Sequence, residues 1–296
     1  MITINEAFAK FKSRLELNEK EQQDATRRHY EVRDVIKEAF SLDRDFLTGS
    51  YARWTKTKPL KDVDVFCVLN RKKEGSYLEK PSRELLEGYR KVLAPKYGED
   101  KVSIGRRCVR VSFGIEEDES ENKVMSIDAV PAFSVENAYQ IPDPHTFADW
   151  TKTDPEIHAE KATAANKSFN EEWKPLVKMI KKWNETQGKP IKASFLIEVM
   201  ALEILYPPFS GGYVYELKSF FATTAERINE TWDDPAGLGP PVSDEMDTAQ
   251  CALAVAKLTE AGKHVDHAIQ LARQGKNGDA LRVWREKIFG KMFPLS

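Results

Sequence analysis

The stretch GSYARWTKTKPLKDVDVFCVL, residues 49–69, decides how the chain folds. Its second half, DVDVFCVL, is rich in β-branched and apolar residues, which is typical of a β-strand. Because side chains two apart on a strand face the same side, Asp62 and Asp64 are expected to point one way. The opposite face would carry the apolar side chains Val63, Val65 and Cys67. We therefore expect two neighbouring carboxylates on one face of a sheet and a buried apolar row on the other.

The segments around this strand predict an α+β chain, with a strand-bearing lobe over residues 1–150 and a helical lobe over residues 151–296. Residues 102–115 are typical of a strand pair or of one long bent strand, and residues 123–133 of a further strand. Amphipathic or buried helices are expected at residues 173–184, 193–205, 216–228, 248–258 and 279–289. We expect the first lobe to contain a mixed sheet with helices and to pack on the second.

The amino-terminal segment is expected to be helical and to belong to the first lobe. Thr3 and Glu6 have the spacing of a capping box. Phe8, Phe11 and Leu15 follow at helical intervals. These three side chains are therefore expected on the buried face of the helix.

Composition excludes several classes of function. The 296 residues carry 45 Lys+Arg against 47 Asp+Glu, for a net charge of -2. Proteins that bind long nucleic acids usually have a basic excess, so we expect no long nucleic acid as partner. Three widely spaced cysteines indicate no disulfide framework. The start, MITINEAFAKF, has no signal-peptide pattern, and the most apolar stretch is interrupted by Glu198 and Glu203. We expect a cytoplasmic protein with no membrane partner.

Two further elements give the paired aspartates a chemical context. Gly49-Ser50 lies upstream in a turn, where glycine allows close backbone approach and the serine hydroxyl can bind phosphate oxygens. Asp128, in the expected strand SIDAVPAF, adds a third carboxylate. Hard oxygen ligands suit Mg²⁺, and a phosphoryl-transfer site needs carboxylates to hold ions and to accept a proton. Taken alone, Asp-x-Asp also fits a solvated strand edge.

Together these motifs resemble the catalytic signature of the polymerase-beta-like nucleotidyltransferases. Within that superfamily the chain is most similar to the bacterial cGAS/DncV-like nucleotidyltransferases, the CD-NTases. The similarity extends to DWTKTDPEIH, LVKMIKKWN, IKASFLIEVM, WDDPAG and IFGKMFP in the second half of the sequence. The resemblance implies a nucleotidyltransferase lobe over residues 1–150 and a helical lobe over residues 151–296 that completes a nucleotide pocket in the cleft between them.

The resemblance also assigns roles to residues of the helical half. It implies that Lys181 and Ser194 hold the donor triphosphate, that Phe195 stacks on a base and that Asn166 reads a base edge. A helical wheel independently places Lys181 at the edge of the apolar face and Lys178 roughly opposite, in solvent. For the lysines taken alone, a solvated cluster is an equally good interpretation. For Asn166, a helix-surface amide is the better one.

These inferences predict an Mg²⁺-dependent synthase, with Mn²⁺ as a substitute, that makes a cyclic di- or oligonucleotide for anti-phage signalling. Asp62, Asp64 and Asp128 would hold the metal ions, and Gly49, Ser50, Lys181 and Ser194 the donor phosphates. Nucleoside triphosphates are the expected partners, with activating proteins encoded nearby, and a monomer is expected.

Three other functions remain open from the sequence. A tRNA terminal nucleotidyltransferase of the CCA-adding type has a very similar Gly-Ser and Asp-Val-Asp region, although such enzymes are longer. A toxin–antitoxin nucleotidyltransferase would modify a protein or a tRNA. A nucleotide sensor without catalysis is disfavoured, because it would not need three clustered carboxylates.

Overall fold

The computed structural model describes residues 2–116, 121–146 and 148–296. The chain forms two compact units. One consists of Leu17–His158, and the other of Met1–Glu16 together with Ala159–Ser296. The first sixteen residues therefore group with the helical unit, whereas the sequence pattern assigned them to the strand-bearing lobe. Each unit is described separately below.

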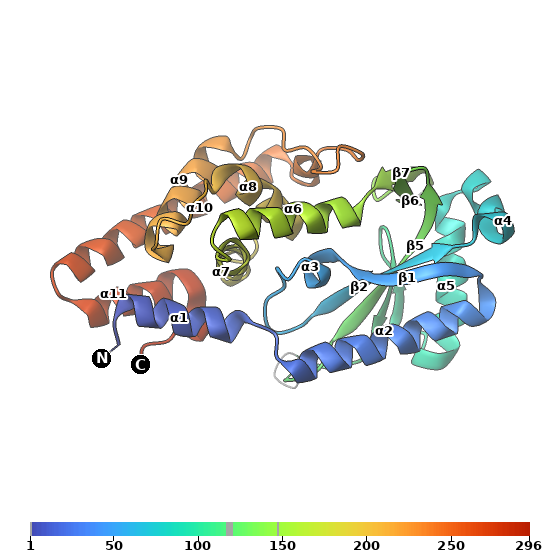
Figure 1. Ribbon diagram of the computed structural model, residues 1–296, viewed down its shortest axis with the longest axis horizontal. Helices are drawn as coiled ribbons and strands as arrows, with labels where there is room; N and C mark the ends of the chain where they lie inside the picture. The colour runs from blue at the N-terminus through green and yellow to red at the C-terminus, as the bar shows by residue number, and fades with distance from the viewer. Residues whose placement is uncertain (1, 117–120, 147) are drawn as a thin grey trace. The chain divides into compact units, whose positions relative to one another are not determined.

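A mixed sheet organises the Leu17–His158 unit (Figure 1). Its central strands, β2 (Asp62–Leu69) and β5 (Ser126–Val135), run parallel. The other strands add antiparallel partners and give the order β1-β2-β5-β4-β3, with β6 on β5 and β7 on β6. These strands are β1 (Leu42–Thr48), β3 (Val102–Ile104), β4 (Val109–Ser112), β6 (Ala138–Pro142) and β7 (Trp150–Thr153). The segment at residues 102–115 is thus the strand pair β3–β4.

Two helices cover one face of this sheet, α2 (Glu19–Ala39) and α5 (Ser82–Tyr97). Val63, Val65 and Cys67 are buried in the core that these helices share with the sheet. This confirms the inward-facing row expected from the alternation of β2. The same alternation places Asp62 and Asp64 on the face opposite α2 and α5. Shorter helical segments of the unit are α3 (Gly49–Ala52), α4 (Arg71–Glu74) and η1 (Gly75–Glu79).

The second unit is helical and is built around one large apolar core. Figure 1 shows its helices from α6 onward, together with α1. They are α1 (Ile4–Leu15), α6 (Pro155–Ser168, which begins in the other unit), α7 (Trp173–Thr186), α8 (Ser194–Ile204), α9 (Tyr213–Arg227), η3 (Val242–Glu245), α10 (Thr248–Arg273), α11 (Asn277–Val283), η4 (Trp284–Phe289) and η5 (Gly290–Met292). Within the described residues, no helix is both long and apolar enough to cross a membrane.

The start of the chain shows why α1 belongs to this unit. Thr3 and Glu6 form the predicted capping box, in which the Glu6 amide donates to the Thr3 hydroxyl at 3.2 Å. Phe8, Phe11 and Leu15 are buried as expected. Both phenylalanines pack against Phe289 near the end of the chain. Burial of the Phe8 and Phe11 side chains in this core therefore determines the unit to which α1 belongs, although α1 precedes the sheet in sequence.

Candidate active site

The strand register brings two of the three predicted aspartates together. Asp64 on β2 lies opposite Asp128 on the parallel strand β5. Asp62 is two residues before Asp64 and therefore shares its face. The three carboxylates predicted from the sequence thus belong to one face of one sheet.

Gly49 can lie close to this carboxylate cluster because it has no side chain. It follows Thr48, which pairs with Asp64 across β1 and β2, and it starts the short helix α3. Its φ is +65°, in the left-handed region that favours glycine. A Cβ at Gly49 would overlap the Asp64 carboxylate. Glycine is therefore required both by the backbone conformation and by the close approach to Asp64.

Asp64 is a carboxylate whose charged form the protein destabilises. Burial, reinforced by the negative charges of Asp62 and Asp128, raises its pKa to about 6. The nearby cations Lys56 and Arg53 oppose this shift of the pKa. A carboxylate that is costly to ionise in the protein alone gains most from an added cation. A bound metal ion would therefore stabilise the charged form of Asp64.

Two cations contact the other two carboxylates, and sequence reasoning missed both. Lys56 forms an ion pair with Asp62 from the basic turn before β2. Arg110 on β4 lies opposite Asp128, and its Nε and Nη2 donate to the two carboxylate oxygens at 2.7 and 2.6 Å. The alternation of Val109 and Val111, both buried, contained the signal for Arg110: it predicts that Arg110 faces the side of the sheet that carries the aspartates.

The chemistry of the three aspartates fits a magnesium site that substrate completes. In the described residues, no group of three His, Cys, Asp or Glu side chains is arranged as a metal site. Mg²⁺ is usually held by one or two carboxylates together with substrate phosphates, so it does not need such a preformed set. Each oxygen of Asp128 keeps one lone pair beyond its bond to Arg110. Asp62, Asp64 and Asp128 could therefore hold metal ions when a triphosphate supplies further oxygens.

The helical unit places Lys181 in a buried ion pair. Lys181 lies on α7, and its Nζ is 2.6 Å from an oxygen of Glu198 on α8, with both residues buried. Lys178 is also buried, at 3% exposure, and it pairs with Glu16. The expectation that Lys178 faces solvent is therefore wrong. Helix α1 covers the side of α7 that the helical wheel assigned to solvent. The wheel could not predict this packing, because it contains no information on distant neighbours.

Ser194 shares a face of α8 with Glu198, the acidic member of this ion pair. It is the exposed first residue of α8, one turn before Glu198, so the two side chains share a face of the helix. Lys181, which contacts Glu198, thus lies toward the same side of α8 as Ser194. Their predicted joint role in phosphate binding stays a prediction.

The other two predicted pocket residues have structural contacts within the helical unit. Phe195 is partly buried against the apolar core. Asn166 is buried, where its amide nitrogen donates to Glu171 and its amide oxygen accepts from the Lys174 backbone at 2.9 Å. Asn166 is therefore not a helix-surface amide: it fixes the turn into α7. The base-reading roles of both residues stay predictions.

Comparison with known proteins gives a family match and two curated relatives. The model of the Second Messenger Oligonucleotide or Dinucleotide Synthetase domain (SMODS) matches residues 1–166. A probable cyclic nucleotide synthase of Bacillus cereus (strain VD146) is 29% identical over an alignment of 282 positions, which covers 83% of this chain and 81% of the relative. A cyclic AMP-AMP-AMP synthase of Acinetobacter sp. is 25% identical over an alignment of 318 positions, gaps included, which covers 100% of this chain and 87% of the relative.

Solved structures share the fold over nearly the whole chain. CdnC of Escherichia coli MS115-1 with ATP has a TM-score of 0.74 at 18% identity, and 99% of each chain is covered. The same protein in its complex with HORMA-deltaN has a TM-score of 0.71 at 19% identity, and 98% of each chain is covered. The expected α+β fold, with a mixed sheet in one unit and helices in the other, is confirmed.

Proposed function

The chain belongs to the Second Messenger Oligonucleotide or Dinucleotide Synthetase family, the CD-NTases, and we propose that it joins nucleoside triphosphates into a cyclic di- or oligonucleotide with the help of Mg²⁺. As a member of this family it is a nucleotidyltransferase. The observation that carries the proposal is the pairing of Asp64 with Asp128 beside Gly49. A carboxylate cluster with a backbone turn at its edge suits a triphosphate and its ions.

The proposed reaction forms one phosphodiester bond for each triphosphate consumed. A ribose hydroxyl attacks the α-phosphorus of a donor triphosphate. The new P–O bond forms as the bond from the α-phosphorus to the bridging oxygen breaks, and pyrophosphate leaves. Asp128 accepts the hydroxyl proton on a lone pair that Arg110 leaves free. Bound Mg²⁺, or Mn²⁺ in its place, would stabilise negative charge on the phosphate oxygens.

The proposed ligand roles combine the sheet geometry around the aspartates with the family resemblance of the helical half. Asp62, Asp64 and Asp128 hold the metal ions. Gly49 and Ser50, at the start of α3, offer backbone N–H groups and a hydroxyl to phosphate oxygens. Lys181 and Ser194 are proposed to bind the donor phosphates from α7 and α8, with Phe195 and Asn166 near the base.

The cyclic product and its biological role rest on similarity. The Acinetobacter relative is named for a ring of three adenylates, so ATP is the first substrate to test here. CdnC was solved with HORMA-deltaN, which supports an activating protein partner for this chain as well. The proposal includes anti-phage signalling, a cytoplasmic location and a monomeric synthase.

Pyrophosphate release measured together with nucleotide incorporation tests this function. The protein is incubated with ATP and with mixed nucleoside triphosphates, in Mg²⁺ or in chelator, without added RNA. The account predicts one pyrophosphate for each nucleotide joined into a ring, and no reaction in chelator. Release of γ-phosphate instead of pyrophosphate would contradict nucleotidyl transfer. Incorporation only after tRNA is added would favour a terminal transferase.

A further inference from the structure

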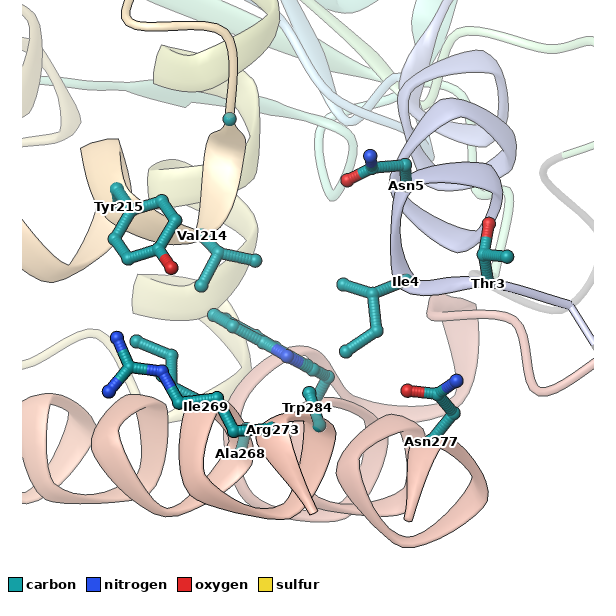
Figure 2. A pocket seen from close by; sticks show the side chains of 12 residues that line it. Thr3, Ile4, Asn5, Val214, Tyr215, Ala268, Ile269, Arg273, Asn277 and Trp284 are labelled. Atoms are coloured by element: carbon teal, nitrogen blue, oxygen red, sulfur yellow. The ribbon is translucent and has the colours of Figure 1, made fainter. Parts of the chain in front are cut away.

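The helical unit contains a cavity that none of the predicted nucleotide-binding residues lines. It has a volume of about 370 Å³, within the range of roughly 300–1,000 Å³ that is common for small-molecule sites. Figure 2 shows it bordered by the start of α1, the start of α9 and the helices α10 and α11. Twelve described residues line it.

Apolar side chains form the body of this cavity. Ile4, Val214 and Ile269 contribute partly buried aliphatic surface, and Ala268 is fully buried. Figure 2 shows Trp284 in the middle of the lining, between Ile269 on one side and Ile4 on the other. An apolar group placed here would lose contact with water on several sides at once.

Polar side chains at the rim have hydrogen-bonding capacity that the protein leaves unused. In the described part of the chain, the side chains of Asn5, Tyr215, Arg273 and Asn277 make no hydrogen bond or ion pair with another residue. Tyr215 is 56% exposed although it is a large aromatic residue. Figure 2 shows the Arg273 guanidinium and the Tyr215 hydroxyl on the same side of the cavity. A ligand could therefore bind both without breaking an existing contact.

Trp284 is the largest aromatic side chain of the lining. It is fully buried, and its indole nitrogen is closed off from solvent and has no hydrogen-bond partner among the described residues. Trp284 therefore belongs to the apolar wall of the cavity and donates no hydrogen bond to a ligand.

The charge of the lining specifies the kind of ligand. Among its twelve described residues, Arg273 carries the single formal charge and there is no carboxylate. A nucleoside triphosphate would need several cations or backbone N–H groups for its phosphates, and one arginine does not provide them. We propose that this cavity binds a small organic monoanion, with its apolar body beside Trp284 and its anionic group on Arg273, where the Tyr215 hydroxyl can donate to it.

A fluorescent monoanion tests the site directly. The probe is 8-anilinonaphthalene-1-sulfonate, which has an aromatic body and one sulfonate, titrated into the folded protein. We expect one saturable site, with about tenfold weaker binding in Arg273→Gln because a charge-assisted contact is lost. The matched control is Arg282→Gln on α11, an exposed arginine paired with Asp279 and absent from the lining.

Two further measurements distinguish a specific site from nonspecific binding to apolar surface. Decanoate should displace the probe at about tenfold lower concentration than decanol, which has the same chain without the charge. Ala272→Phe, at a partly exposed position of the lining, should fill the cavity and abolish probe binding while circular dichroism stays unchanged. Absence of a saturable site, equal binding by Arg273→Gln and Arg282→Gln, or equal displacement by decanoate and decanol would each overturn the proposal.

Discussion

Arg110 and Asp128 face each other across β4 and β5, and two hydrogen bonds of 2.7 and 2.6 Å join the guanidinium to both carboxylate oxygens. Asp128 is buried, whereas the Arg110 side chain is 48% exposed. The contact raises the pKa of Arg110 further above its already high ordinary value. Arg110 therefore stays charged, orients Asp128 and neutralises part of the negative charge of the aspartate cluster.

We predict that Arg110→Gln tightens Mg²⁺ binding but lowers turnover. The variant leaves the three aspartates without this cation, so the Mg²⁺ concentration for half-maximal activity should fall. Turnover at saturating Mg²⁺ should fall about tenfold or more, because Asp128 loses its fixed orientation. Steady-state rates over a range of Mg²⁺ concentrations measure both effects. Arg83→Gln, which removes an exposed arginine on α5, is the control. An unchanged Mg²⁺ requirement in Arg110→Gln would contradict the proposed role.

The double substitution Asp62→Asn with Asp64→Asn should abolish synthesis while the fold remains. The change keeps the shape of both side chains but removes two ligand charges. Loss of metal binding should cost several kcal/mol of transition-state stabilisation, or more than about a thousandfold in rate. Product formation and melting temperature are measured together, with Asp34→Asn on the exposed side of α2 as control. A tenth of wild-type turnover in the double variant would be incompatible with the two carboxylates as metal ligands.

Asp64→Asn alone should stabilise the metal-free protein at neutral pH. The folded-state pKa of Asp64 is about 6, above its ordinary value of 3.8. Between pH 3.8 and about pH 6 the folded protein therefore binds more protons than the unfolded protein. The contribution of Asp64 to stability therefore falls as pH rises from about 4 to about 6, and stays low above that range. The variant should gain up to about 3 kcal/mol at pH 7.5 and little at pH 4.

Denaturant unfolding in chelator at both pH values measures this gain. Mg²⁺ should raise the melting temperature of the wild type more than that of Asp64→Asn, since binding to the folded state stabilises it. Equal stability of the two proteins at pH 7.5 in chelator would show that the folded protein does not destabilise the charged form of Asp64.

Lys181 should matter for donor binding even though it is buried. Removing Lys181 alone would leave Glu198 charged and unpaired, so the test uses Lys181→Met with Glu198→Gln. This double variant should weaken triphosphate binding about ten- to a hundredfold, the value of a charge-assisted contact. Lys178→Met is the control, because its partner Glu16 is 43% exposed and tolerates the loss. Triphosphate affinity is measured by calorimetry, and equal affinities of the two variants would remove Lys181 from the donor site.

Local sequence patterns predicted those features that depend only on neighbouring residues, such as the buried face of a strand and the cap of a helix. The alternation around Asp62 and Asp64 gave the buried row of β2, and the spacing of Thr3 and Glu6 gave the cap of α1. The contact between Arg110 and Asp128 depends instead on which strand lies beside β5 and in which register. Alternation indicates a face of a strand but no partner, so this pair could not be predicted.

Distant packing also decided where two segments of the helical unit lie. Helix α1 packs through Phe8 and Phe11 on aromatic residues near the end of the chain, such as Phe289. The ion pair between Lys178 and Glu16 likewise joins residues far apart in sequence. Helical periodicity identifies an apolar stripe without naming the element that covers it, so neither contact follows from the local pattern.

The most direct test of the central claim is the chemical form of the product made from nucleoside triphosphates and Mg²⁺ alone. A linear oligonucleotide started from a triphosphate keeps 5′ phosphates that phosphatase removes, whereas a ring has only internal phosphodiesters. The reaction is run without RNA, alone and with the proteins encoded beside this one, and in parallel with added tRNA. The products are treated with phosphatase and analysed by chromatography and mass spectrometry. The account predicts a compact product that resists phosphatase and has the mass of a cyclic di- or oligonucleotide. A ladder of phosphatase-sensitive linear species, or incorporation only into added tRNA, would contradict it.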